Sequence, residues 1–320
     1  MKKEYQLDQI DKEIIWVLDE NARHSVSRIS QLIGCSKQKV SYRLRKMIKL
    51  GILNLFSTII NKTKLGYFPC QIYLKFKKTP SCKEVLKKLE KIPSLHWEGL
   101  VEGDYDLIIF IMIKSLEECW KVYQTIIDKF SDSLVKKEIL LSSTTYHFNH
   151  SYLTKAPRKI SISEFPHRQT ELKQRDLKLI NAIKENGRIQ INQLAKQIKI
   201  TPYTIRQRIA YLKRRGVIEG FKIRINDNLI GFCRYIILFS LVEANSYQKK
   251  HFLKILIKNK RVHRIIETIG KWDLVCDIVL PKKENPKSWL KKILRKASLK
   301  NKTSILKTKE IFKINSVVYS

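Results

Sequence analysis

Residues 33–52 read IGCSKQKVSYRLRKMIKLGI, and residues 198–217 read IKITPYTIRQRIAYLKRRGV. In both stretches a hydroxyl residue, Ser36 or Thr201, stands where a helix N-cap belongs. Apolar residues follow at helical spacing, and a glycine then ends the helix. A short helix with its own apolar face precedes each stretch. Three helices with a tight turn before the third form a helix-turn-helix, so the chain encodes this unit twice.

The two stretches belong to a longer internal repeat. When the sequence is shifted by 165 residues, 7–67 aligns with its copy without a gap, and Asp11, for example, falls on Asp176. Further along, Gly103-Asp-Tyr-Asp-Leu matches Gly270-Lys-Trp-Asp-Leu at a shift of 167. Self-similarity at one fixed spacing indicates a duplicated unit of about 150 residues.

The second part of each unit reads strand–helix–strand–strand–helix–strand. In the first unit we expect strands at 70–77, 95–102, 106–113 and 134–147, and helices at 81–91 and 115–130. In the second we expect strands at 233–243, 262–269, 273–280 and 303–319, and helices at 247–259 and 285–298. This order is that of a ferredoxin-like sandwich. Between the two parts, Phe221, Ile223 and Ile225 alternate and predict a strand or wing.

The sequence therefore predicts an α+β fold of two winged helix-turn-helix domains, each followed by a ferredoxin-like βαββαβ sandwich. The expected boundaries are 1–62 and 63–150 for the first unit and 171–227 and 228–320 for the second, with a linker over 151–170. Prolines, serines and basic residues between 149 and 170 are typical of an exposed connection.

The chain is strongly basic, with 64 Lys+Arg against 29 Asp+Glu and a net charge of +35. Such a charge points to a polyanion, and first to nucleic acid. Residues 68–148 carry 12 basic and 11 acidic residues, whereas 233–320 carry 21 and 6. The basic clusters in 258–261 and 291–296 therefore suggest a second face that holds DNA. The alternative is that these lysines only reflect the general enrichment of the chain in Lys, Ile and Asn.

Other classes of protein receive little support. No apolar run approaches the roughly 18 residues of a membrane span, and the N-terminus has no apolar signal core, so we expect a cytoplasmic protein without a membrane partner. The six cysteines include no Cys-x-x-Cys pair, and His147-x-x-His150 has no Glu. His96 and His263 have no evident acid–base partner. We expect no metal, no cofactor and no catalytic residue.

The third helix of each helical domain is the predicted DNA reader. With Val40, Leu44 and Met47 packed inward, a basic and polar face turns outward and fits the major groove. Gln38 and Gln207 suit adenine. The predicted contacts in the first helix are Lys37, Gln38, Lys39, Ser41, Tyr42, Arg43, Arg45 and Lys46. Those in the second are Tyr203, Thr204, Arg206, Gln207, Arg208, Lys213 and Arg214.

Individual readers have different expected roles. Arg206 suits guanine, whereas lysines and the later arginines suit phosphates, which position the protein without reading sequence. Arg43 and Arg208 occupy equivalent positions and have a second possible role, an ion pair with Asp11 or Asp176 inside the helical domain. A solvated basic helix face is the alternative to DNA contact for the whole set.

These motifs, in this order and spacing, resemble the Lrp/AsnC family of transcription regulators. The resemblance rests on Leu7-Asp8-x-x-Asp11, Asn21-Ala22-Arg23, Ile33-Gly34-x-Ser36 and Gly103-Asp-Tyr-Asp-Leu107, and on their counterparts in the second unit. It covers nearly the whole chain twice, whereas the usual family chain carries one unit. It implies a winged DNA-binding domain followed by an effector-binding and dimerisation domain, with double-stranded DNA as partner.

The resemblance also implies that a small effector, often an amino acid, binds beside the glycine turn. The expected residues are Gly103, Asp104, Tyr105 and Asp106 in the first unit and Gly270, Lys271, Trp272 and Asp273 in the second. Plain hairpin chemistry is the alternative. Lys271 in place of Asp104 reverses a charge and weakens the case for an amino-acid site in the second unit. Self-association through the sandwiches is expected, either between the units of one chain or between two chains.

Two other functions stay open at this stage. Some proteins of this architecture, including fused pairs, are sirohaem decarboxylases, which carry a His-Asn-Tyr-type strand that this chain lacks; it has Trp97-Glu-Gly instead. A chromatin-like protein that binds DNA without sequence preference is the other. We expect a sequence-specific regulator and not an enzyme.

Overall fold

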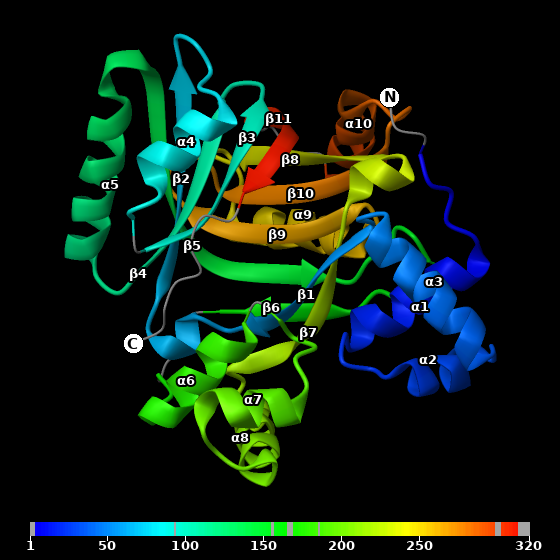
Figure 1. The fold of residues 1–320 in the computed structure, drawn as a ribbon. Coiled ribbons are helices and arrows are strands. Elements are labelled where there is room, and N and C mark those ends of the chain that lie inside the picture. Colours follow the sequence, from blue (N-terminus) through cyan, green and yellow to red (C-terminus); the bar gives the residue numbers. More distant parts are fainter. Residues whose placement is uncertain are drawn as a thin grey trace.

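In the computed structural model, the described residues are 4–92, 94–154, 157–164, 169–184, 186–297 and 302–312. Two three-helix domains lie beside a large sheet that is covered by four further helices (Figure 1). The helices of the first domain are α1 (Gln9–Glu20), α2 (Val26–Ile33) and α3 (Lys37–Lys49). Those of the second are α6 (Gln174–Ile183), α7 (Ile191–Ile198) and α8 (Pro202–Arg214).

The helices begin where their capping residues predict. The Ser36 side chain accepts a hydrogen bond from the Lys39 amide, and Thr201 accepts one from the Thr204 amide, with Pro202 in the first turn of α8. Val40, Leu44 and Met47 are buried on the inner side of α3. Burial of one apolar face leaves the opposite face of each third helix to solvent.

The wings of the two units pair with each other. Strands β1 (Leu53–Ile60) and β7 (Ile218–Ile225) form a two-stranded antiparallel sheet, which we call the wing ribbon. Beside it, Arg23 donates to the carbonyls of Gly187 and Ile189 at 2.7 and 3.0 Å. Arg188, the equivalent residue of the second unit, donates to the His24 carbonyl at 2.9 Å. The ribbon and this reciprocal arginine clamp fix one helical domain against the other.

The two sandwiches merge into one closed sheet. The strands of the first are β2 (Phe68–Phe76), β3 (Leu95–Glu102), β4 (Leu107–Ile113) and β5 (Leu134–Phe148). Those of the second are β8 (Phe232–Ser240), β9 (Val262–Ile269), β10 (Leu274–Pro281) and β11 (Lys302–Phe312). The pairing order runs β2-β4-β3-β11-β8-β10-β9-β5 and returns from β5 to β2, so these strands form a barrel.

The last strand of each unit joins the two units together. The first half of β5 pairs with β2 of its own unit and the second half with β9 of the other. In the same way β11 pairs with β8 and then with β3. Both pairings are antiparallel and run within one chain, so the duplicated units form an intramolecular pseudo-dimer.

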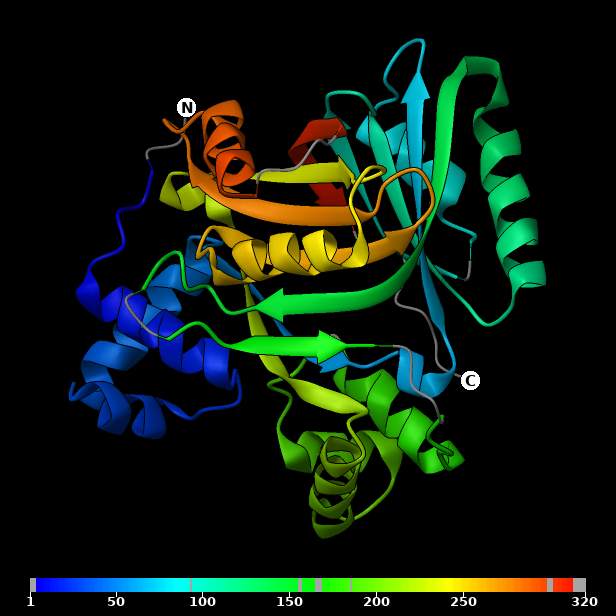
Figure 2. The ribbon, with the colours of Figure 1, turned by 180° about the vertical axis from the view of Figure 1, so that it is seen from behind.

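The barrel sheet is packed on both its inner and its outer face. Side chains that include Tyr73, Tyr105 and Trp272 fill the barrel interior and are continuous with the core of the helical domains. On the outside, α4 (Cys82–Leu89) and α5 (Leu116–Phe130) cover the first sandwich, and α9 (Ser246–Lys258) and α10 (Pro286–Ala297) cover the second (Figure 2). The apolar run in β4, which is buried at every position, reflects this two-sided burial.

The structure confirms the predicted fold of two winged helix-turn-helix domains, each followed by a ferredoxin-like sandwich. One expectation is wrong: the linker is not simply an exposed connection. Residues Asn149, His150, Ser151 and Leu153 are buried, and β6 (Ile160–Ser163) pairs with the end of β5. The apolar residues of this segment pack into the core that the domains share. The last expected strand is described only to Phe312, and 313–320 lie outside the described residues.

Three short 3-10 turns complete the description: Thr63–Leu65, Ser131–Ser133 and Asp227–Ile230. Within the described part of the chain, no helix combines the length and the apolar character that crossing a bilayer demands.

Strands β5 and β11 are exchanged between the units, and β11 contacts the turn at Gly103. This contact gives a test of the barrel. Gly103 has φ +145°, and a Cβ there would lie 2.6 Å from the Ile305 carbonyl oxygen of β11. We expect Gly103→Ala to lower the free energy of unfolding by about 3 kcal/mol, because it adds a clash to a backbone conformation that favours glycine. Denaturant unfolding measures the change.

The matched control is Gly34→Ala. Gly34 also has a positive φ, +66°, but a Cβ there would meet nothing within 4 Å. Its expected loss is about 1 kcal/mol, from backbone conformation alone. Equal losses in the two variants would show that β11 does not press on the Gly103 turn.

Candidate functional site

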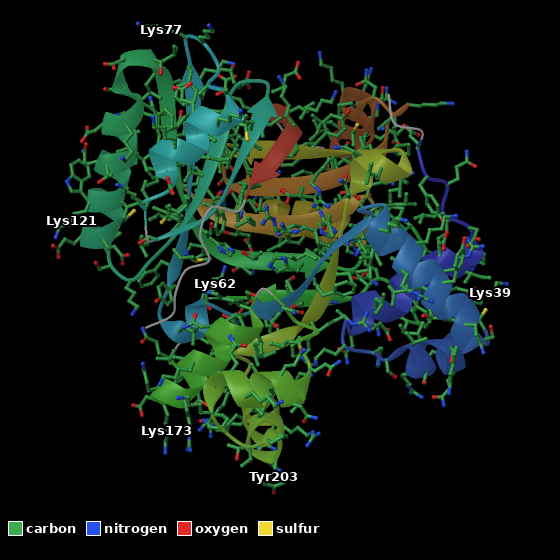
Figure 3. The ribbon with its side chains drawn as sticks, viewed as in Figure 1. Lys39, Lys62, Lys77, Lys121, Lys173 and Tyr203 are labelled. Atoms are coloured by element: carbon green, nitrogen blue, oxygen red, sulfur yellow. The ribbon has the colours of Figure 1, made fainter. Side chains whose placement is uncertain are left out.

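The outer face of α3 is polar, basic and accessible. Of the predicted readers, Lys37, Gln38, Lys39, Tyr42 and Arg45 are exposed, and Tyr42 keeps 59% of its surface in solvent. Ser41 and Lys46 are partly buried, and the Lys46 ammonium lies over the Tyr5 ring, 5.2 Å from its centroid. Lys39 points away from the molecule (Figure 3). The face is long enough and open enough to enter a major groove.

The second reader, α8, presents a comparable face. Tyr203, Arg206, Gln207, Lys213 and Arg214 are exposed. Tyr203 keeps 69% of its surface in solvent and lies at the far tip of the second helical domain (Figure 3). Thr204 is partly buried, and its hydroxyl lies 2.9 Å from that of Thr201 at the helix cap.

Two of the predicted readers are engaged inside their own domains. Arg208 holds the buried Asp176 carboxylate through two hydrogen bonds of 2.6 and 2.5 Å. Arg43 lies 2.8 Å from Asp8 and 3.7 Å from Asp11. Of the two roles that the sequence left open, the geometry favours the internal ion pair, which ties the third helix to the first helix of each domain. Burial lowers the pKa of the Arg43 guanidinium, but its hydrogen bond with Tyr5 and the charges of Asp11 and Asp8 raise that pKa overall. The hydrogen bonds with Asp176 raise the pKa of Arg208, against a smaller opposite effect of burial.

Sequence reasoning missed two groups of residues in the helical domains. Arg215 is exposed directly after α8 and extends the basic face of that helix. Arg23 and Arg188, which form the clamp between the helical domains, were noted only as part of a repeated motif. The available signal was their identity in both units at positions that no core or reading role explains.

The predicted effector turns lie in the barrel wall and are packed by the exchanged strands. Tyr105 is fully buried, and its hydroxyl accepts a hydrogen bond of 3.3 Å from the indole of Trp272, its counterpart in the second unit. Gly103 lies against β11, and Gly270 lies against Ile139 and Leu140 of β5. The two turns are therefore in contact through their aromatic residues, and their glycines accommodate backbone rather than open space.

Polar residues of the turns have partners in the protein. Asp106 pairs with Lys75 at 2.8 Å and accepts a hydrogen bond from the Phe76 amide. Asp273 pairs with Lys249 at 2.6 Å and accepts one from the Leu241 amide. Lys271 pairs with Glu138 at 2.7 Å, while Asp104 is exposed. The last residue of each turn, Asp106 or Asp273, therefore stabilises its own sandwich.

Comparison with known proteins agrees with this geometry. A family model described as winged helix-turn-helix DNA-binding matches the chain twice, at 7–54 and 172–219. An uncharacterized HTH-type transcriptional regulator of Pyrococcus furiosus is 32% identical over 112 residues, which are 35% of this chain and 76% of that protein. The HTH-type transcriptional regulator FL11 of Pyrococcus horikoshii is 32% identical over 35% of this chain and 74% of that protein.

The chain belongs to the Lrp/AsnC family of transcription regulators. Each relative corresponds to about one repeat, so this member carries two family units in one chain. The crystal structure of the sirohaem decarboxylase NirDL has the same overall arrangement, with a TM-score of 0.63 over 98% of this chain and 94% of that one. Its sequence identity is 14%, and the likeness therefore establishes a shared fold only.

The two arginine classes on α8 can be separated by experiment. Arg208→Ala leaves the buried Asp176 carboxylate without its partner and should lower the free energy of unfolding by about 3 kcal/mol. Arg206→Ala removes an exposed side chain and should change that free energy by less than about 0.5 kcal/mol while weakening DNA binding. Chemical denaturation and a DNA-binding titration measure both quantities. Equal destabilisation by the two variants would contradict the assignment of Arg208 to the domain interior.

Proposed function

We propose that this Lrp/AsnC protein binds DNA as a built-in dimer, in which a single chain places two different reading helices on two half-sites. The observation that carries the proposal is the fixed connection between the units. The wing ribbon, the arginine clamp and the closed barrel hold α3 and α8 in one relative position. A family member with one unit needs a second chain to supply the second reader.

Divergence of the two readers favours an asymmetric operator. The first helix opens with Lys37, Gln38 and Lys39, and the second opens with Pro202, Tyr203 and Thr204. Residues near the N-terminus of a reading helix lie nearest the base edges, so these helices select different bases. Gln38 and Gln207 are exposed and suit adenine, and Arg206 is exposed and suits guanine. Exposed lysines and later arginines supply phosphate contacts.

Regulation by a ligand belongs to the same proposal. The eight turn residues predicted as effector contacts stay a prediction. Their glycines pack against the exchanged strands, whereas Asp104 and Lys271 are exposed. Association between chains through the barrel is not required for a complete sheet, because every barrel strand already has two neighbours.

We also propose that the chain acts as a regulator and not as an enzyme. The observation that favours an enzyme instead is the fold that the chain shares with a sirohaem decarboxylase over nearly its whole length. Absorption separates the two: a tetrapyrrole-binding protein shifts the strong band near 400 nm when an iron porphyrin is added. No shift is expected here, and stoichiometric binding followed by loss of carboxyl groups would establish the enzyme instead.

The test of the regulator is selection of bound duplexes from a random pool. We expect two unlike half-sites separated by about one helical turn or a multiple of it, and binding that weakens steeply with salt. Arg206→Ala should relax the preference within the half-site read by α8 and leave the other half-site unchanged. Recovery of duplexes without any shared motif would replace the proposal by non-specific, chromatin-like binding. Failure to bind DNA at low salt would overturn it.

A further inference from the structure

The two helices that cover the second sandwich carry basic residues and no acidic ones. Together α9 and α10 contain nine Lys and Arg and no Asp or Glu. The equivalent helices of the first sandwich, α4 and α5, contain five basic and four acidic residues. A general enrichment of the chain in lysine would raise the charge of both sandwiches, so it does not explain this difference. The excess of positive charge belongs to one sandwich only.

The exposed cations of α9 and α10 form a row along each helix. Phe252 and Leu256 bury the inner side of α9, and Trp289 and Ile293 bury that of α10. The cations on the opposite side are spaced at i, i+4 and i+8, and they are Lys250, Lys254 and Lys258 on α9 and Lys287, Lys291 and Arg295 on α10. Like charges at this spacing repel one another, and a polyanion that lies along the row removes this repulsion.

Acids of the protein do not neutralise these two rows. None of the six side chains forms an ion pair with an Asp or Glu of the described residues, because nearby acids are engaged elsewhere. Asp273 pairs with Lys249 at 2.6 Å, on another side of α9. Glu284, just before α10, lies 3.9 Å from Arg261. The rows are therefore available to an anion outside the molecule.

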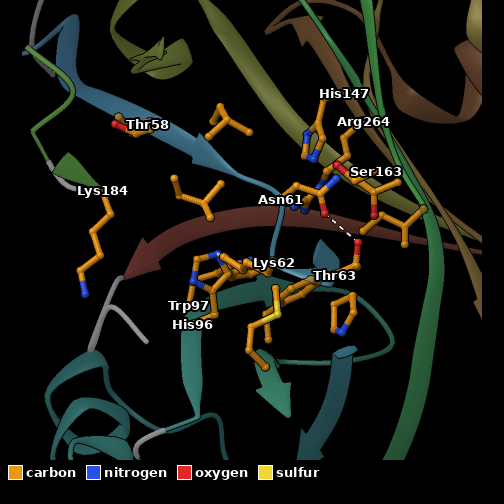
Figure 4. Close-up of a pocket in the computed structure, with 18 of the residues that line it drawn as sticks. Thr58, Asn61, Lys62, Thr63, His96, Trp97, His147, Ser163, Lys184 and Arg264 are labelled. Atoms are coloured by element: carbon orange, nitrogen blue, oxygen red, sulfur yellow. Dashed lines mark hydrogen bonds between the residues drawn. The ribbon is translucent and has the colours of Figure 1, made fainter. Parts of the chain in front are cut away.

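Cations inside the joint between the two units are not accessible to a DNA duplex. Lys62, Arg224 and Arg264 line a cavity of about 210 Å³ between the wing ribbon and the barrel (Figure 4). The major groove of DNA alone is about 12 Å wide, so a duplex does not enter a cavity of this size. By contrast, α9 and α10 lie on the outside of the barrel, where a duplex can reach them (Figure 2).

The second sandwich lies beside the first helical domain. Lys282, which precedes α10, pairs at 2.7 Å with Glu4, which precedes α1. In both views α10 lies on the side of the barrel that carries α1, α2 and α3, whereas α5 lies on the opposite side (Figure 1, Figure 2). A duplex that spans α8 and α3 and bends back toward the barrel therefore meets α10 beyond α3. Beyond α8 it meets the nearly neutral first sandwich.

We propose that the outer faces of α9 and α10 bind the phosphates of the double-stranded DNA that flanks the half-site read by α3. This inference rests on the proposed function, because it names one flank of the operator that α3 and α8 bind. Bending the flank toward the barrel costs elastic energy, which the phosphate contacts offset. The first sandwich lacks the excess charge, so the protein extends its contact with DNA on one side only.

The experiment measures how flanking DNA changes the affinity of the full chain. One probe is the duplex selected from the random pool and trimmed to its two half-sites. Two longer probes carry about two further helical turns beyond one half-site or the other, and Arg206→Ala identifies the half-site that α8 reads. We expect the flank beyond the α3 half-site to tighten binding about tenfold and to steepen its salt dependence. The other flank should change little, and hydroxyl-radical footprinting should show protection of the first flank alone.

The variant that tests the surface combines Lys287→Gln, Lys291→Gln and Arg295→Gln. It should abolish the gain from the flank and reduce the steepness of the salt slope on that probe by about 2, because up to three phosphate contacts are lost. Its affinity for the trimmed duplex should equal that of the wild type. Thermal unfolding first establishes that the variant is folded, and Lys250→Gln with Lys254→Gln replaces it if it is not.

The matched control combines Lys83→Gln, Lys87→Gln and Lys91→Gln, which removes the same charge from exposed positions in and directly after α4. It should keep the gain from the flank. Equal loss in the two triple variants would overturn the proposal and indicate attraction by overall charge, and equal gains from both flanks, or none, would also overturn it. These outcomes leave binding to the trimmed duplex intact. Failure to obtain or bind that duplex would instead overturn the proposed function, and this inference with it.

Discussion

The structure depends on how two four-stranded sheets pair the backbone amides and carbonyls of their outer strands. A sheet of this size leaves a row of unpaired amides and carbonyls on each outer strand, and such edges pair with whatever strand is near. Here β5 and β11 are long enough to pair with a strand of their own unit and then with one of the other unit. The barrel closes, and its interior is sealed by Tyr105 and Trp272 from the two glycine turns. The two repeats therefore form one structural unit rather than two independent domains joined by a linker.

Closure of the barrel has consequences for the helical domains. The chain enters the barrel from each wing, so the joined sandwiches bring β1 and β7 together as a ribbon. Arg23 and Arg188 then bond across to backbone carbonyls of the opposite domain. Each reading helix is fixed to its own domain by an internal ion pair, Arg208 with Asp176 in the second unit. Rigid connections run from the barrel to both reading faces.

Much of this could be predicted from the sequence because the signals are local. The capping residues Ser36 and Thr201, the helical spacing of Val40 and Leu44, and the repeat itself predicted both helical domains and both sandwiches. The exchange of β5 and β11 could not be predicted, since pairing between distant strands leaves no periodic pattern. The buried part of the linker was missed because Leu153 lies in a segment whose prolines, serines and basic residues are typical of an exposed connection.

Asymmetry between equivalent positions is what the duplicated chain gains over a symmetric dimer. Two copies of one chain must present the same reading helix twice, whereas this chain presents two unlike reading helices. The central claim, that one chain is the complete DNA-binding unit, is tested most directly by sedimentation of the protein with a duplex that carries both half-sites. One 37.8 kDa chain for each duplex is the predicted stoichiometry. Two chains on each duplex, with one reader of each chain unused, would contradict it.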